Sequence, residues 1–283
     1  RNPQHGEQWK ATLQTYAAPI FGQLPVDAID TGLVLKALEP IWATKAETAS
    51  RVRGRIESIL DWAKVRGYRS GENPARWRGH LDKLLPARSK VKRVEHHPAM
   101  AIDDLPAFAT ELRGKEFVSA KALEFTILTA ARTGEVIGAR WSEFDLDKSI
   151  WTVPGERMKS GREHRVPFPA RAVELLKSLP REENNEHVFI GGKQGKGLSN
   201  MALLELLRGM RPEGGLTVHG FRSTFRDWSA ERTAFASEVV ESALAHVIEN
   251  KVEAAYRRGD LLDKRRALLV EWEEFLLGDG DVK

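Results

Sequence analysis

The sequence contains no cysteine among its 283 residues. A disulfide scaffold, a thiol nucleophile and any cysteine-ligated zinc or iron–sulfur site are therefore excluded. The sequence also has no run of 18 apolar residues, and its start, RNPQHGEQWK, has no apolar signal region. We therefore expect no membrane-spanning helix and no intact secretory signal, and we predict a soluble, cytoplasmic protein. Because residue 1 is Arg rather than Met, we expect this sequence to be part of a longer chain.

Charge is distributed unevenly along the chain, although the net charge is only +4. Residues 1–98 carry 17 basic and 10 acidic side chains, a net +7, whereas the remaining 185 residues carry 27 and 30, a net −3. A concentrated positive field favours a polyanionic partner, although a solvated basic surface would show the same excess. The length, about twice that of a typical domain, and the 41% hydrophobic content predict two folded domains.

The N-terminal third has the pattern of a small helical domain. Residues 47–66 place Val52, Ile56, Ile59, Leu60 and Ala63 on one helical stripe, which predicts an amphipathic helix. The stretch 88–93, RSKVKR, has four positive charges and no negative charge, and it lacks a helical stripe. We therefore predict that it is a basic linker.

The second domain is predicted to begin with a helix capped by Asp103, with Leu105, Phe108, Ala109 and Leu112 on its buried face. Residues 150–153 and 164–168 change to strand-like patterns and are joined by a loop that contains Lys159. Helical patterns then cover 170–178, 199–210, 218–230, 236–245, 249–258 and 261–277, with one short strand candidate at 187–190. The predicted fold class is mainly α with a small antiparallel β-sheet (α+β).

Two segments place basic side chains where they can meet an anion. Arg132 is followed three residues later by Glu135, which could orient its guanidinium, although an ordinary salt bridge at a helix junction explains the same pair. His219 and Arg222 are spaced i and i+3, so they share a helical face behind a plausible cap at Thr217. That spacing alone is weak evidence for an anion site, because a chain this rich in basic residues produces it by chance.

The C-terminal region adds LAHVIENKVEAAYRR, which contains His246 and Tyr256. Tyr256 is the only tyrosine after Tyr68. A half-buried aromatic whose hydroxyl reaches the surface would also explain it.

The phrases ARTGEVIGARWSEFDLD, ERMKSGREHRVPF, LTVHGFRSTFRDW and LAHVIENKVEAAYRR together resemble the tyrosine recombinases, most closely the integrases of prophages and genomic islands. The order of Arg, a hairpin Lys, H-x-x-R, His and Tyr is that of the family. The ten-residue step from His246 to Tyr256 is one longer than in many members. The resemblance covers almost the whole chain.

The resemblance implies a helical core-binding domain at 1–90, a basic linker at 91–98 and a catalytic domain at 99–283, which together clamp duplex DNA. It implies site-specific recombination that integrates or excises a prophage or genomic island, with no cofactor and no metal. The implied partners are attachment-site DNA, further copies of the chain in a homotetramer on paired sites, and accessory DNA-bending or directionality factors. Free in solution, the protein is expected as a monomer, and in the cell at the bacterial nucleoid.

The same resemblance implies a role for each candidate residue. Tyr256 would be the nucleophile that forms a 3′-phosphotyrosine, and Lys159 the general acid. Arg132, Arg222 and His246 would stabilise the transition state, with Glu135 supporting them, and His219 would be either an acid/base partner or a phosphate ligand. By charge alone, the candidate phosphate contacts are Arg51, Arg55, Arg88, Lys90, Lys92 and Arg93.

Three other functions share parts of this pattern. A metal-dependent nuclease would need clustered carboxylates, and Glu143, Asp145 and Asp147 are the compact group available, although a turn after a helix explains them too. Loss of DNA cleavage in EDTA would indicate the metal-dependent nuclease, whereas cleavage that persists in EDTA would exclude it. A non-catalytic DNA-binding module would form no covalent adduct, and a type IB topoisomerase would relax supercoils without exchanging strands between two sites.

The segment 260–278 follows the nucleophile's predicted helix and carries an apolar stripe. Its members are Leu261, Leu268, Leu269, Trp272, Phe275 and Leu276. We expect this stripe to mediate contacts between protomers, the alternative being packing within its own chain.

Overall fold

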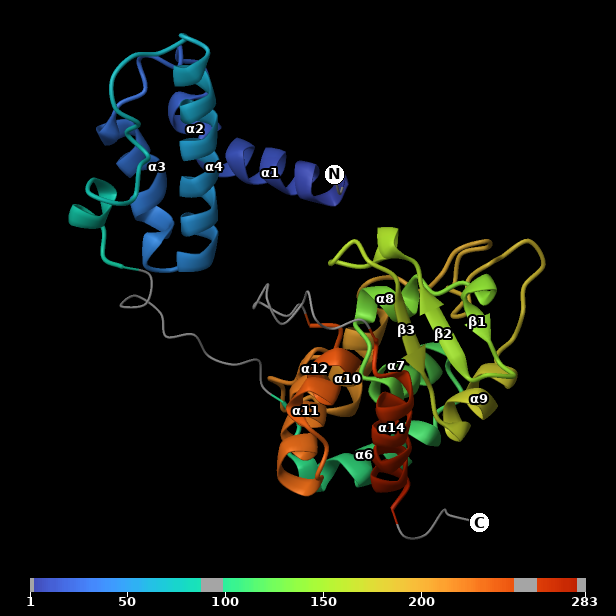
Figure 1. Ribbon diagram of the computed structural model, residues 1–283. Helices are drawn as coiled ribbons and strands as arrows, with labels where there is room; N and C mark the ends of the chain where they lie inside the picture. The colour runs from blue at the N-terminus through green and yellow to red at the C-terminus, as the bar shows by residue number, and fades with distance from the viewer. Residues whose placement is uncertain (1–2, 88–98, 247–258, 279–283) are drawn as a thin grey trace. The chain divides into compact units, whose positions relative to one another are not determined.

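The computed structural model describes residues 3–87, 99–246 and 259–278, and the chain divides into two compact units, Arg1–His96 and His97–Lys283 (Figure 1). The fold is mainly helical with one small antiparallel sheet, so the predicted fold class is confirmed. None of the helices within the described ranges is long and apolar enough to cross a membrane.

The N-terminal unit is built from α1 (Pro3–Tyr16), α2 (Ala18–Phe21), α3 (Thr31–Trp42) and α4 (Ala46–Val65), followed by a 3₁₀ turn at Leu81–Lys83. Helix α3 begins after Asp30, whose carboxylate accepts a 2.8 Å hydrogen bond from the Leu33 N–H and so caps the first turn. The buried faces of α3 and α4 meet through side chains such as Leu38 and Leu60 and form the core of this unit.

Helix α4 confirms the predicted helix to within one residue at each end, and Val52, Ile56, Leu60 and Ala63 are buried as expected. The prediction was wrong for Ile59, which lies at the edge of the stripe and is 39% exposed.

Arg55, a predicted phosphate contact, is only 5% exposed. It donates to the Gln8 carbonyl at 2.9 Å and to the Thr12 hydroxyl, and its guanidinium carbon lies 5.6 Å from the centre of the Trp9 ring. The guanidinium therefore fastens α1 to α4. It does not provide the free surface charge that a phosphate contact requires.

The C-terminal unit packs its helices and its sheet against one shared core (Figure 1). The helices are α6 (Leu105–Arg113), α7 (Val118–Thr129), α8 (Thr133–Ile137), α9 (Ala170–Lys177), α10 (Ala202–Met210), α11 (Gly220–Arg232), α12 (Ser237–Ala243) and α14 (Leu262–Leu277). The four residues predicted for the buried face of α6 are buried. The predicted cap at Asp103 is wrong, because its carboxylate pairs with Arg232 at 2.8 Å instead. The helix predicted at 249–258 lies outside the described residues.

The sheet has the strand order β1 (Phe144–Asp145), β2 (Ile150–Val153), β3 (His164–Pro167), with both pairs antiparallel. The two predicted strands are confirmed and pair Val153 with His164. The sequence explains Asp145 by a turn after a helix, whereas the structure places it in β1. A strand of two residues is too short to show a period. The strand candidate at 187–190 forms only isolated bridges, at His187 and Ile190.

The C-terminal stripe packs inside its own unit. Leu268 and Trp272 are fully buried, and the Trp272 indole N–H donates to the Ile127 carbonyl at 2.9 Å. Helix α14 contacts α6, α7, α12 and β3. The expectation that this stripe contacts other protomers was therefore wrong, because the matching apolar faces belong to the same unit.

We predict that Leu268→Ala lowers the free energy of unfolding by about 2–5 kcal/mol, because it removes a fully buried side chain and leaves a cavity. Val270→Ala on the same helix should change it by no more than about 0.5 kcal/mol, since Val270 is 39% exposed. Denaturant unfolding of both variants, followed by circular dichroism, measures the difference. Equal effects would contradict the core position of α14.

Candidate active site

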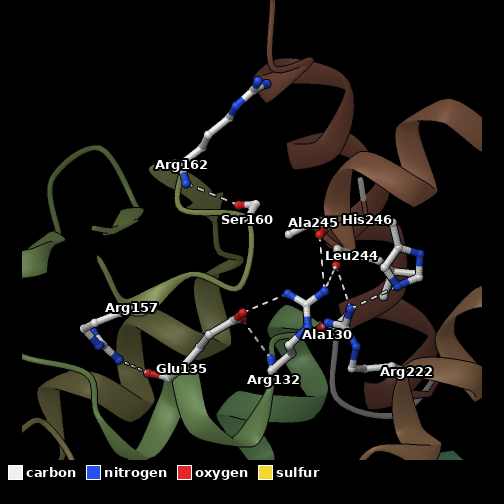
Figure 2. A network of polar contacts seen from close by, with 10 residues as sticks. All are labelled: Ala130, Arg132, Glu135, Arg157, Ser160, Arg162, Arg222, Leu244, Ala245 and His246. Atoms are coloured by element: carbon white, nitrogen blue, oxygen red, sulfur yellow. Dashed lines mark hydrogen bonds and ion pairs between the residues drawn. The ribbon is translucent and has the colours of Figure 1, made fainter. Parts of the chain in front are cut away.

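Arg132 lies between α7 and α8 and is held by Glu135 at two points. The Glu135 carboxylate accepts from the Arg132 backbone N–H at 3.0 Å and from its Nη1 at 2.8 Å (Figure 2). Glu135 is 6% exposed, so this ion pair is shielded on its carboxylate side. One carboxylate thus caps the first turn of α8 and also fixes the direction of the guanidinium.

Arg222 comes from the first turn of α11 and is 5% exposed. Its Nη1 donates to the Ala130 carbonyl, and its Nη2 donates to the Leu244 carbonyl at 2.6 Å. Arg132 reaches the same segment, because its Nη2 lies 3.3 Å from the Leu244 carbonyl and 3.2 Å from the Ala245 carbonyl. The two guanidinium groups therefore share a backbone acceptor (Figure 2).

The acceptors of both arginines lie where two helices end. Helix α7 ends at Thr129 and α12 at Ala243, and Ala130 and Leu244 follow directly. Carbonyls at a helix C-terminus lack an intrahelical partner and carry partial negative charge, so they suit a cation. Ala130 (φ 50°) and Ala245 (φ 48°) both adopt left-handed backbone conformations, which cost about 1 kcal/mol or more in a residue other than glycine. Two residues with a strained backbone therefore lie beside these arginines.

His246 completes this group. Its Nδ1 lies 2.5 Å from the Glu241 carboxylate. Its Nε2 lies 3.4 Å from Nη2 of Arg222, a contact that Figure 2 shows. Glu241 also pairs with Arg226 at 3.0 Å. The Glu241 carboxylate therefore orients the imidazole so that its second nitrogen faces Arg222.

Burial and the neighbouring Arg132 charge lower the pKa of Arg222 to about 10, while Glu135 and Glu241 oppose this effect. Arg222 therefore remains charged at neutral pH. Two like charges held this close repel one another, and a bound anion relieves the repulsion. The arrangement is suited to an anion that carries several acceptor oxygens, such as a phosphate.

Lys159 lies in the exposed turn between β2 and β3. The Gly161 N–H donates to the Met158 carbonyl at 3.0 Å and closes a four-residue turn with Lys159 and Ser160 at its centre. A Cβ on Gly155 would lie 2.7 Å from the Gly161 carbonyl oxygen, so a glycine there lets the two sides of the hairpin approach closely. Figure 2 shows Arg162, on the same hairpin, pointing away from the paired arginines.

His219 is exposed and is the N-cap residue of α11, three positions before Arg222. The predicted cap residue Thr217 uses its hydroxyl to accept from the Gly220 N–H at 3.1 Å. The start of α11 thus carries an exposed imidazole and a buried guanidinium in the same turn.

The carboxylates considered for a metal site have other partners. Glu143 pairs with Arg157 and accepts from the Trp151 indole N–H at 2.9 Å, and Asp145 accepts from Lys148 at 2.9 Å. Across the described ranges, no three histidine or carboxylate side chains group as they would around a metal. Arg157 also donates to the Glu135 backbone carbonyl, which joins the base of the hairpin to α8 (Figure 2).

The structure brings Arg132, Glu135, Arg222 and His246 into one network, and it places Lys159 and His219 in the same unit. Arg51 lies on α4, where it is exposed and pairs with Glu47 at 3.0 Å. The remaining candidates, Tyr256, Arg88, Lys90, Lys92 and Arg93, lie outside the described residues.

Sequence reasoning missed two members of this neighbourhood. Glu241 precedes His246 by five residues, a spacing that does not indicate a pair within one helix. His164, at the start of β3, lies within the electrostatic influence of Arg132, Glu135 and Arg265, which shift the pKa of its ring. Only its presence in the phrase REHRVP could have drawn attention to it.

Known proteins resemble this chain along both units. Residues 1–80 match the phage integrase central domain, and residues 99–260 match the phage integrase family. The prophage integrase IntZ of Escherichia coli K12 is 30% identical over 283 residues, which cover 98% of this chain and 68% of IntZ. The integrase of Enterobacteria phage P4 is 29% identical over 285 residues, which cover 93% of this chain and 63% of that integrase. This chain thus spans about two thirds of its relatives' length.

Among solved structures, a lambda integrase tetramer bound to a Holliday junction matches with a TM-score of 0.66 and 16% identity. The match covers 89% of this chain and 74% of that chain. At this identity the likeness supports the fold.

The half-buried imidazole of His164 predicts a pH-dependent stability. Burial first, then the charge of Arg265, lowers the His164 pKa from 6.5 to about 4. Below pH 6.5 the unfolded chain therefore binds a proton that the folded chain does not, and stability falls by up to about 1.4 kcal/mol per pH unit until pH reaches about 4. His164→Gln should flatten this slope in denaturant unfolding between pH 7 and 4. The same slope in both proteins would contradict the assignment.

Proposed function

The chain belongs to the phage integrase family, the tyrosine recombinases of phage-integrase type, and from that premise we propose that it is a site-specific DNA recombinase. It would cleave and rejoin DNA through a 3′-phosphotyrosine intermediate and integrate or excise a prophage or genomic island. The observation that carries this proposal is the network of Arg132, Arg222 and His246, a preorganised cationic group suited to a phosphate.

The scissile phosphate would bind at the paired guanidinium groups. The Arg222 Nε is buried and has no hydrogen-bond acceptor within the part of the chain that the structure describes. A buried donor without an acceptor costs free energy, so a phosphate oxygen placed there gains a hydrogen bond. As negative charge develops on the non-bridging oxygens, Arg132, Arg222 and His246 would stabilise the transition state. Guanidinium groups supply this charge without a metal ion.

The proposed chemistry conserves the energy of the phosphodiester. The Tyr256 hydroxyl oxygen attacks phosphorus, the bond to the 5′-oxygen breaks, and Lys159 donates a proton to the leaving oxygen. His219 would accept the tyrosine proton or bind the phosphate. The 5′-hydroxyl of a partner strand then reverses the step and releases Tyr256.

We assign DNA binding in part to the N-terminal unit, which with the following residues carries the net +7 of positions 1–98. Arg51 is exposed on α4 and can turn to a phosphate at the cost of a weak surface pair with Glu47. The basic residues Arg88, Lys90, Lys92 and Arg93 would add phosphate contacts that fix position without reading sequence. In this proposal the units are a core-binding domain at 1–90 and a catalytic domain at 99–283, with the linker 91–98 between them.

Recombination joins two duplexes, so we propose a homotetramer on paired attachment sites. The lambda integrase match is such a tetramer on a Holliday junction, which supports the proposal by analogy. Accessory DNA-bending or directionality factors would select integration or excision, and a DNA substrate places the protein at the bacterial nucleoid.

Replacing the proposed nucleophile tests the reaction class. Tyr256→Phe should abolish covalent adduct formation on a nicked suicide substrate and leave DNA affinity nearly unchanged, because only the nucleophilic oxygen is lost. Denaturing gels detect the adduct, and EDTA should not prevent its formation by the unsubstituted protein. An adduct formed by the Phe variant would reject Tyr256, and sensitivity to EDTA would favour a metal-dependent nuclease.

Leaving-group chemistry tests Lys159. A bridging 5′-sulfur leaves as a thiolate and needs no proton, so it should rescue Lys159→Ala by about 10²-fold or more. The cleavage rate of Arg132→Ala should rise far less on the sulfur substrate, because this variant still lacks a group that stabilises the negative charge on the non-bridging oxygens. Single-turnover cleavage rates on oxygen and sulfur substrates measure both. Equal rescue of the two variants would assign the acid to another residue.

A further inference from the structure

A second charged cluster holds the chain directly after the proposed nucleophile. Asp260 is bound by side chains from three elements: Arg165 of β3, Arg265 of α14, and Ser242 of α12. Its carboxylate lies 2.8 Å from the Arg165 Nη2, 2.9 Å from the Arg165 Nε and 3.1 Å from the Arg265 Nη2. We call Arg165, Asp260 and Arg265 the Asp260 cluster.

Arg265 makes this cluster rigid. It is 1% exposed, and it donates to the Asp260 backbone carbonyl at 2.7 Å and to the Arg165 backbone carbonyl at 2.6 Å. A buried guanidinium is costly unless its charge is paired and its donors are bonded, and the Arg265 Nη2 has the Asp260 carboxylate as its ion-pair partner but no hydrogen bond within the described residues. Removing the acceptors that Arg265 does have is therefore strongly unfavourable. The Ser242 hydroxyl adds a 3.3 Å hydrogen bond to the same Asp260 carbonyl. The backbone of Asp260 is therefore fixed to both α14 and α12.

The cluster joins the segments that carry the proposed catalytic groups. In the sequence Asp260 follows Tyr256 by four residues, and Arg165 follows Lys159 by six within the same hairpin. Ser242 precedes His246 by four residues. Four residues of chain span at most about 14 Å, so a fixed Asp260 limits how far Tyr256 can move from it.

We propose that Asp260 is a positioning residue, which ties the chain after Tyr256 to β3 and α12 so that the tyrosine is presented to the phosphate at Arg132 and Arg222. This inference rests on the proposed function. Within the part of the chain that the structure describes, the cluster shares no ion pair or hydrogen bond with Arg132, Arg222 or His246, so it lies outside the network that we propose for the phosphate. Its effect is therefore expected on the rate of attack and not on DNA affinity.

The experiment compares Asp260→Asn, Arg165→Gln and the double variant in the full 283-residue chain. Glu111→Gln is the matched control, because the Glu111–Arg211 pair also joins two elements of this unit at 2.8 Å and is similarly half-exposed. Both cluster variants should slow single-turnover cleavage by about ten- to a hundredfold, since a misplacement of about 1 Å can cost that much. The double variant should be no slower than either single variant, and Glu111→Gln should cleave at the unsubstituted rate.

Two further readouts separate positioning from a general loss of structure. DNA affinity should remain within about twofold of the unsubstituted protein, and a bridging 5′-sulfur should not rescue Asp260→Asn, because attack rather than departure is impaired. If Asp260→Asn fails to fold, the cleavage rate of Arg165→Gln tests the proposal instead. This variant keeps the backbone carbonyl that Arg265 binds, so the buried guanidinium retains that acceptor.

The proposal is overturned by unchanged cleavage in the cluster variants, by an equal loss in Glu111→Gln, or by sulfur rescue of Asp260→Asn, which would place the effect on the acid. These outcomes differ from a failure of the proposed function. In that case the unsubstituted protein itself forms no covalent adduct, or Tyr256→Phe still forms one.

Discussion

The C-terminal unit depends on one interaction, the burial of the Arg222 guanidinium against the carbonyls that follow α7 and α12. A cation this deeply buried is tolerable only where acceptors converge on it, and the ends of two helices provide them. The same carbonyls reach Arg132, so one packing arrangement positions both positive charges. A site for an anion thus arises from how three helices meet.

Two carboxylates orient the side chains of this site. Glu135 fixes Arg132, and Glu241 fixes His246, whereas Arg222 is held by backbone carbonyls. The Asp260 cluster repeats this arrangement at the other end of the segment that carries His246 and Tyr256, with the buried Arg265 as its support. Preorganised donors of this kind stabilise a transition state without paying for reorientation during the reaction.

Local patterns were informative wherever a residue's role depends on its neighbours in the sequence. The periods of α4 and α6 predicted their buried faces, and the change of period at 150–153 and 164–168 predicted β2 and β3. Errors arose where partners are distant: Arg55 is buried because α1 covers it, and the stripe of α14 packs in its own unit because α6, α7 and α12 present apolar faces to it. A periodic pattern of apolar or basic residues does not specify which part of the protein packs against those side chains.

The sequence by itself determined the fold class and the order of the candidate residues, and through its motifs it indicated the family. Only the tertiary structure decided that Arg132, Arg222 and His246 meet beside Leu244 and Ala245, and that Glu241 orients His246 there. The reason is physical. Helical and strand periods record local backbone geometry, whereas a buried guanidinium is satisfied by backbone carbonyls, which every residue possesses and which no pattern of side chains reveals.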